Sequence, residues 1–175
     1  MACPRTLLPI LGTLTLAWLA GCASVSGPAA TASLQPTTGS AASGTVKFAQ
    51  SGGQVTVSGE VRGLKPNAEH GFHIHEKGDC SSGDGMSAGG HFNPGGKPHG
   101  QHGHAAHHAG DLPSLKANAS GVASFNFQSS TIRVGGGAAD VIGKGLIVHR
   151  DPDDYQTQPT GNAGPRLACA VITKS

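Results

Sequence analysis

The chain has 175 residues, which is enough for one domain with a core of its own. Its formal net charge of +2 and its aromatic content of 4% exclude the basic, base-stacking surface that nucleic-acid binding requires. Because charged residues make up only 13% and there are 28 glycines, the composition favours an all-β protein rich in turns over a helical one.

Residues 1–22 have the features of a secretory signal peptide. Arg5 supplies a positive start, and the apolar run from Leu7 to Ala20 is shorter than the roughly 20 residues of a transmembrane helix. The run ends in Leu-Ala-Gly-Cys, which resembles the lipobox of bacterial lipoproteins and predicts that Cys22 is lipidated. An ordinary signal peptide with a chance cysteine is the alternative. We expect residues 23–28 to be a spacer, and the domain to lie in the periplasm or cell envelope, anchored to a membrane by lipid.

Cys80 and Cys169 are the cysteines that remain in the mature domain besides the lipidated one. Outside the cytosol such a pair is expected to be oxidised, and two free buried thiols are the alternative. A bond between them would close a loop of about 90 residues, and on the chain-entropy model it would contribute on the order of 4–5 kcal/mol.

Short segments in which apolar and polar residues alternate begin after the spacer. Val46 and Phe48 flank Lys47, for example, and a period of two indicates strands with one buried face. Residues 51–53, Ser-Gly-Gly, predict a hairpin turn. We expect strands at residues 30–34, 46–48, 55–61, 69–75, 121–128, 131–134, 144–149 and 167–173. Short strands in this number, with no amphipathic helix and no internal repeat, predict an all-β sandwich or barrel.

Two long stretches, residues 76–118 and 150–166, interrupt this pattern and hold most of the Gly, Pro, Asp and His. Long loops inside a compact domain are usually functional. Nine of the ten histidines lie between His70 and His108, so the unusual chemistry is concentrated there.

Two groups of these residues could bind metal ions. His73 and His75 stand two apart on a predicted strand, so both side chains leave the same face, although His-x-His pairs also occur by chance. Three imidazoles and one carboxylate form a closed set typical of structural zinc, namely His91, His99, His108 and Asp111. A solvated loop without a defined site is the alternative for that set. His149 ends an apolar run and, considered singly, is equally consistent with a core histidine.

Five segments together resemble the bacterial copper/zinc superoxide dismutases, in the same order along the chain. They include Gly-Phe-His-Ile-His and Gly-Gly-His-Phe-Asn-Pro, and they are residues 71–80, 89–94, 108–113, 148–155 and 158–169. The resemblance implies an eight-stranded Greek-key β-barrel, a sandwich of the immunoglobulin-like type, over residues 29–175. It also implies an enzyme that converts the superoxide anion to oxygen and hydrogen peroxide and protects the cell envelope. Its cofactors would be one copper, cycling between Cu(II) and Cu(I), and one zinc per subunit.

The resemblance gives each matching residue a role. It implies that copper is bound by His73, His75, His91 and His149. It implies that zinc is bound by His91, His99, His108 and Asp111, so that His91 bridges both metals and takes part in catalysis. Asp153 would link a copper histidine to a zinc histidine, and Arg166 would attract the substrate anion. The family disulfide would join Cys80 and Cys169.

Several residues have no role in this pattern. They are His70, the loop histidines His102, His104 and His107, and Pro165, which departs from the family pattern before Arg166. Solvated polar residues are the expectation for the loop histidines, and metal capture or delivery is the alternative. Three further positive charges could extend the electrostatic field that attracts the superoxide anion, namely Lys77, Lys97 and Arg150.

Two other functions compete with the enzyme. A lipoprotein that buffers metal without turnover would be favoured by loss of a copper histidine or of Arg166, and neither is lost. A purely structural domain leaves the histidines at the motif positions unexplained. The sequence does not distinguish a monomer from a homodimer.

Overall fold

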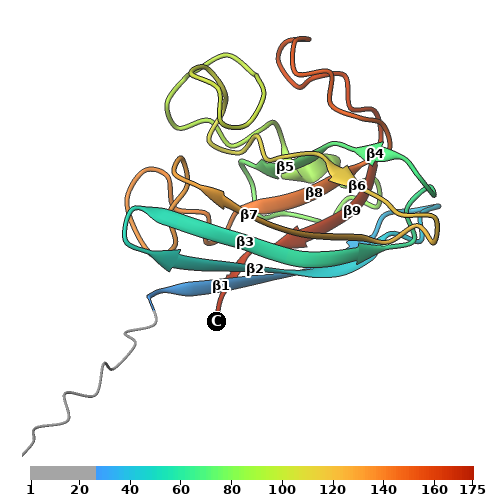
Figure 1. Cartoon of the computed structure of the whole chain (residues 1–175), viewed down its shortest axis with the longest axis horizontal. Coiled ribbons are helices and arrows are strands. Elements are labelled where there is room, and N and C mark those ends of the chain that lie inside the picture. The colour runs from blue at the N-terminus through green and yellow to red at the C-terminus, as the bar shows by residue number, and fades with distance from the viewer. Residues whose placement is uncertain (1–26) are drawn as a thin grey trace, which may run out of the picture.

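The computed structural model describes residues 27–175, so the predicted signal peptide, the predicted lipidation site Cys22 and most of the predicted spacer lie outside the described residues. Within that range the chain forms ten strands and one 3-10 turn, η1 (Met86–Ala88). The strands are β1 (Ala29–Pro36), β2 (Ser43–Ser51), β3 (Gln54–Arg62), β4 (Glu69–His70), β5 (Phe72–His75), β6 (Leu115–Lys116), β7 (Ala123–Ser129), β8 (Gly145–His149), β9 (Arg166–Val171) and β10 (Thr173–Lys174) (Figure 1). A helix capable of spanning a membrane does not occur among these residues.

The alternating sequence pattern corresponds to one buried and one exposed face on the first three strands. On β2 the side chains of Val46 and Phe48 are buried, whereas Lys47 between them is exposed. The predicted hairpin turn is also confirmed, because β2 pairs with β3 across Gly52 and Gly53. Gly52 has a φ of 53°, a conformation that residues with a side chain rarely adopt.

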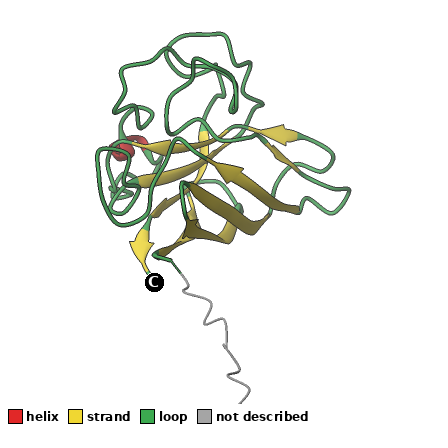
Figure 2. Ribbon diagram, turned by 60° about the vertical axis from the view of Figure 1, so that its left-hand side comes forward, coloured by secondary structure: helices red, strands yellow, loops and turns green. Residues whose placement is uncertain are grey.

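Eight of the strands form one antiparallel sheet in the order β5-β8-β9-β1-β2-β3-β7, with β10 added beside β1. The chain crosses from β3 to β5 at the far end of this order, returns to β7 beside β3, and crosses again to β8. Such crossovers between antiparallel strands are the mark of a Greek key. The sheet curls around an apolar core, so the predicted eight-stranded barrel fold is confirmed (Figure 2).

One predicted strand is wrong. Residues 131–134 form an irregular segment whose only bridge joins Arg133 to Asp140. Ile132 and Val134 are buried as the alternation suggested, but positive φ angles at residues 135–137 turn the chain away before a ladder can form. The short strand β6, which pairs with β4, lies inside the stretch predicted to be a loop.

Strands β5 and β8 differ from the others because all their residues are buried. Phe72 and Ile74 of β5 belong to the apolar core. His73 and His75 alternate with them, so they point to the opposite face. The two long loops rise on the same side of the sheet in Figure 1, and their residues Asp153 and His91 contact His73 and His75. Period-two geometry therefore places a histidine pair under the loops, on a strand that the core holds rigid.

The predicted disulfide joins Cys80 and Cys169, whose Cα atoms are 5.8 Å apart. Cys169 lies on β9, while Cys80 lies in the long loop that follows β5. The bond therefore ties the first part of this loop to the sheet, where Cys169 packs with Ala88 and Ile147.

We expect Cys80→Ser to lower the free energy of unfolding by about 4 kcal/mol, because the released loop adds conformational entropy to the unfolded chain. Urea unfolding of the metal-free domain measures this loss. Wild-type protein treated with a thiol reductant should show the same loss. Equal stability of the oxidised and reduced wild type would contradict the prediction.

Candidate metal centre

Four buried histidines from three parts of the chain meet at one point. His73 and His75 lie on β5, and His149 ends β8. His91 lies in the loop after β5 and forms an isolated bridge to His75. One nitrogen atom from each of the four rings lies within 4.8 Å of the others. We call these four residues the four-histidine set.

The hydrogen bonds of these rings leave four nitrogen atoms facing one another. Nδ1 of His75 lies 2.8 Å from the Gly89 carbonyl oxygen, and Nδ1 of His149 lies 3.0 Å from the Gly164 carbonyl oxygen. A carbonyl oxygen only accepts, so each Nδ1 carries the proton and each Nε2 presents a lone pair. These two Nε2 atoms, Nε2 of His91 and Nδ1 of His73 are buried without a hydrogen-bond partner. Unpaired lone pairs that converge in this way fit a metal ion.

Burial keeps three residues of the four-histidine set neutral, namely His75, His91 and His149. It lowers the pKa of His91 to about 4 and that of His149 to about 3, and it lowers the pKa of His75 well below its ordinary value. Neighbouring imidazoles contribute in the same direction, because a second positive ring would repel the first. Neutral imidazole is the form that binds metal, so these residues are ready for a cation at neutral pH.

The second group brings three imidazoles onto one carboxylate oxygen. Nδ1 atoms of His91, His99 and His108 lie 2.8, 3.1 and 3.3 Å from Oδ1 of Asp111. A tetrahedral zinc ion with bonds of about 2.0–2.1 Å requires ligand atoms separated by about 3.3 Å. The spacing and the closed set of nitrogen and oxygen atoms therefore fit zinc. We call these four residues the His3Asp set.

Asp111 is held in its ionised form. Burial by itself would raise its pKa, but hydrogen bonds with His108, His91 and His99 outweigh this effect and lower the pKa below its ordinary range. Its second oxygen, Oδ2, accepts hydrogen bonds from the backbone N–H groups of Gly100 and His108. These contacts orient Oδ1 toward the three rings.

His91 belongs to both sets, and Asp153 connects them a second time. The His91 ring directs Nδ1 to the His3Asp set and Nε2 to the four-histidine set. Oδ2 of Asp153 accepts from Nε2 of His73 at 2.7 Å, and Oδ1 accepts from Nε2 of His99 at 2.9 Å. Burial opposes protonation of His99, but its hydrogen bonds with Asp111 and Asp153 outweigh burial and raise its pKa to about 9.

Arg166 lies beside the four-histidine set at the start of β9. Its Nη1 and Nη2 atoms donate to the carbonyl oxygens of Gly85 and Gly89, each at 2.6 Å. The Gly89 carbonyl also accepts from His75, so a single backbone group positions the guanidinium and a metal-facing histidine. Gly89 has a φ of 75°, which explains why this position requires glycine. Sequence reasoning missed Gly89, whose only signal is its place in the Gly-Gly-His segment.

His70, to which the sequence assigned no role, is fully buried under the same site. Its Nδ1 lies 2.9 Å from the carbonyl oxygen of His149 and donates to it. It therefore holds the backbone of a histidine of the four-histidine set.

The extra histidines of the loop join neither set. Nδ1 of His102 lies 3.0 Å from the Asp111 carbonyl oxygen, and Nδ1 of His107 lies 2.6 Å from the His108 carbonyl oxygen. The expectation of solvated side chains is wrong for His107, which is buried, whereas His104 is exposed. His107 is buried because it turns back onto the loop backbone and packs beside His102, with ring centroids 5.4 Å apart.

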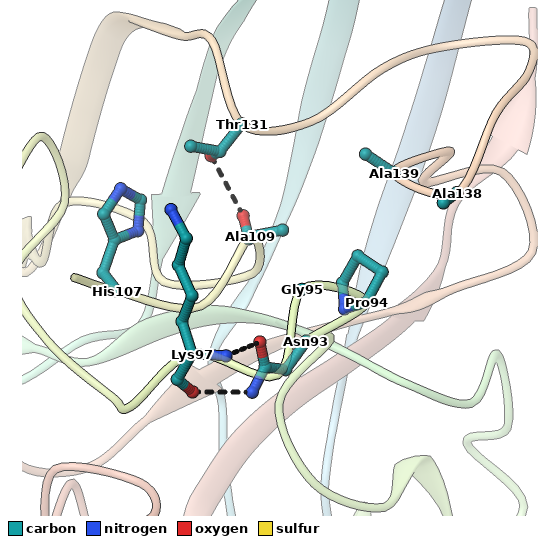
Figure 3. Close-up of a pocket in the computed structure, with 9 residues that line it drawn as sticks. All are labelled: Asn93, Pro94, Gly95, Lys97, His107, Ala109, Thr131, Ala138 and Ala139. Carbon is teal, nitrogen blue, oxygen red and sulfur yellow. Dashed lines mark hydrogen bonds between the residues drawn. The ribbon is translucent and has the colours of Figure 1, made fainter. Parts of the chain in front are cut away.

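The candidate steering charges lie in different surroundings. Lys97 lines a separate cavity of about 310 Å³ with His107, and the lining includes no residue of either metal set (Figure 3). Arg150 is paired with Asp151 at 2.8 Å, which offsets much of its charge. The Lys77 side chain lies near Gly89, where an added Cβ atom would be in van der Waals contact with it.

Two metal sets that share one imidazole, covered by loops on an antiparallel Greek-key barrel, define a binuclear metal centre. The family model described as copper/zinc superoxide dismutase (SODC) matches residues 42–172. The chain is 43% identical over 138 residues to a superoxide dismutase [Cu-Zn] of Saccharomyces cerevisiae, covering 74% of this chain and 88% of the relative. A superoxide dismutase [Cu-Zn] of Paramecium bursaria Chlorella virus 1 is 39% identical over 135 residues, covering 74% and 71%.

A solved structure, that of the clock protein EA4, is 36% identical with a TM-score of 0.76, covering 85% of this chain and 95% of that chain. The chain belongs to the copper/zinc superoxide dismutase family. It is therefore an oxidoreductase that dismutes superoxide with copper and zinc as cofactors. The four-histidine set and the His3Asp set fit these two ions.

We expect Asp153→Asn to weaken metal binding at the His3Asp set by about 10- to 100-fold. Both rings that contact Asp153 donate from Nε2, and an asparagine offers one acceptor where the carboxylate offers two. One histidine is then left facing an N–H group. Competition with a zinc chelator measures the affinity.

Glu60→Gln is the control, because this carboxylate lies on β3 and bonds to Arg62 and Ser124, away from both metal sets. Equal zinc affinities of Asp153→Asn and Glu60→Gln would contradict the role of Asp153.

Proposed function

We propose that copper is held by the four-histidine set and zinc by the His3Asp set, with His91 between them. The observation that carries this assignment is the group of four buried imidazole nitrogens that face one another without a partner. Four imidazoles suit both oxidation states of copper, whereas three imidazoles and a carboxylate form a closed site for zinc. When bound there, copper would supply the one-electron redox chemistry that the reaction of superoxide needs.

His91 is the residue that we expect to move a proton. Its Nδ1 faces the other residues of the His3Asp set, which keep the ring in place, while its Nε2 is buried and has no hydrogen-bond partner among residues 27–175. Nε2 can therefore hold a proton whenever this atom is not bound to a metal. From that position it can donate the proton to the peroxide that forms in the second half of the reaction.

Arg166 is the residue that we expect to bind the substrate anion. Its guanidinium is fixed by two carbonyl oxygens and is only partly buried, beside His75 and His149. Two fixed contacts leave further N–H groups available, and a positive charge at this position raises the local concentration of a small anion. Pro165 precedes it without disturbing either of its hydrogen bonds.

The enzyme loaded with copper and zinc should scavenge superoxide, and His149→Ala should abolish this turnover. The variant loses one of the four nitrogens at the copper position, while its ring has only a single hydrogen bond, to the Gly164 carbonyl. Stopped-flow decay of superoxide measures turnover, and circular dichroism reports whether the barrel is intact. His104→Ala, an exposed histidine outside both sets, is the matched control.

Loaded wild-type protein without turnover would favour the metal-buffering alternative over the enzyme.

We also propose that the enzyme acts in the bacterial cell envelope, held on a membrane by a lipid on Cys22, and removes superoxide there. The support is the signal-like sequence of residues 1–22 with its Leu-Ala-Gly-Cys ending. The Cys80–Cys169 bond supports it as well, because disulfides persist in oxidising compartments outside the cytosol. A homodimer is a separate hypothesis, which sedimentation of the mature domain tests.

Cys22→Ser should remove the lipid acceptor and release the protein from membranes into the soluble fraction, or leave its leader uncleaved. Membrane fractionation of a bacterial host that expresses the full chain, with mass spectrometry of the N-terminus, measures both. Cys3→Ser, which changes the other cysteine of the leader, should leave fractionation unchanged. A wild-type chain that is soluble and carries no lipid would refute the anchor.

A further inference from the structure

His99 of the His3Asp set lies in a loop segment that no strand supports. It is buried, yet its backbone N–H and C=O groups form no backbone–backbone hydrogen bond among the described residues. Buried backbone groups are nearly always paired, so another partner must hold them.

One side chain supplies both hydrogen bonds. The His99 N–H donates to Oε1 of Gln158 at 2.9 Å, and Nε2 of Gln158 donates to the His99 carbonyl oxygen at 2.9 Å. The amide thus pairs with His99 as a neighbouring strand would. Because the two bonds run in opposite directions, only a side chain with both a donor and an acceptor can form them.

Gln158 lies in the second long loop, residues 150–166, which also holds the ring of His99. Asp153 of this loop accepts from Nε2 of the His99 ring at 2.9 Å. Gly161 of the same loop lies so close to this contact that a Cβ atom there would collide with both Asp153 and His99. The second loop therefore holds His99 at the two ends of its backbone unit and at one ring nitrogen. The other ring nitrogen of His99, Nδ1, faces Asp111 and is available to a metal ion.

The loop that carries Gln158 has its own internal hydrogen bonds. Asp154 accepts from the backbone N–H groups of Gln156 and Thr157 and from the Thr157 hydroxyl. Gly161 donates to the Thr157 carbonyl oxygen at 2.7 Å. Gln158 therefore lies in a turn that these hydrogen bonds hold in place, so its amide can position His99.

We propose that Gln158 is a positioning residue for zinc. It fixes the backbone of His99 before the metal arrives and slows the loss of zinc afterwards. Asp153 orients the ring of His99, but a ring is placed correctly only if the backbone that carries it is also fixed. The inference rests on the proposed assignment of zinc to the His3Asp set.

The test uses the full domain loaded with copper and zinc, and compares Gln158→Ala with Gln156→Ala. Gln156 lies in the same loop and is exposed, and its side chain has no hydrogen bond in the described structure, so the pair differs in the clamp alone. Zinc release to a chelator should be about 10-fold faster in Gln158→Ala and unchanged in Gln156→Ala. Gln158→Glu keeps the acceptor but loses the donor, and should lie between wild type and Gln158→Ala.

Two further measurements separate positioning from general stability. Amide hydrogen exchange of the metal-free protein should be faster at His99 in Gln158→Ala, with no change at the β2–β3 pairs. Cobalt bound at the zinc position should show an altered visible absorption spectrum in Gln158→Ala only. Zinc release at the wild-type rate in Gln158→Ala, or equal acceleration in Gln156→Ala, would overturn the proposal.

The assignment of zinc is checked separately on the wild type. Anomalous X-ray scattering at the zinc edge should place zinc within bonding distance of His99 and Asp111. Wild type without zinc there would refute the assignment itself, whereas wild type with zinc there and an indifferent Gln158→Ala would refute only the clamp.

Discussion

The structure depends on one constraint, which is that buried imidazole nitrogens need partners. In the part of the chain that the structure describes, each histidine of the four-histidine set has a buried ring nitrogen without a hydrogen bond, and these four atoms face one another. Leaving a buried polar atom unpaired costs about 1–3 kcal/mol, and converging lone pairs also repel one another. Metal ions convert this cost into bonding, so the same arrangement that weakens the metal-free fold is what gives it affinity for cations.

The two metal sets are supported in different ways. Three of the four histidines of the four-histidine set lie on β5 and β8, which pair with each other and are buried on both faces. The residues of the His3Asp set lie in loops, where His91 and Asp111 form isolated bridges to β5 and His99 and His108 form none in the described structure. Side chains therefore supply much of the support that a ladder gives elsewhere. Asp111 accepts backbone N–H groups, and Gln158 pairs with the backbone of His99. The disulfide acts similarly for the segment that carries Gly85 and Gly89.

Much of the barrel could be predicted from the sequence, because a strand with one buried face has apolar residues at every second position. Val46 and Phe48 of β2 show this pattern plainly. The same signal failed at residues 131–134, since Ile132 and Val134 are buried in a segment without a ladder. Alternation reports burial, and only indirectly the hydrogen bonding of a strand. The Greek-key topology came from the family resemblance, because nothing in a local pattern specifies which distant strands meet.

The residues of the site also fall into those that the sequence could predict and those that it could not. His73 and His75 could be paired from strand geometry alone, whereas the groups that hold the ligands could not be found locally. Gln158 and His99 are 59 positions apart, and His70 and His149 are 79 apart, so their contacts exist only in the folded chain. Gly89 acts through its carbonyl oxygen, which every residue possesses, and glycine has no functional group in the side chain that would reveal this role.

Two side chains of the described structure connect the metal sets, and they do so in different ways. His91 presents one nitrogen to each set, so any displacement of its ring is felt at both. Asp153 reaches His73 and His99 from behind, through the nitrogens that do not face a metal. Backbone bridges also join the first loop to β5, because His91 pairs with His75 and Asp111 pairs with His73. Three histidines of the four-histidine set lie on β5 and β8, whereas His99 and His108 have no strand pairing in the described structure. The consequence is an asymmetry, because a change in the loops leaves the backbones of those three histidines in place but displaces His99 and His108 directly.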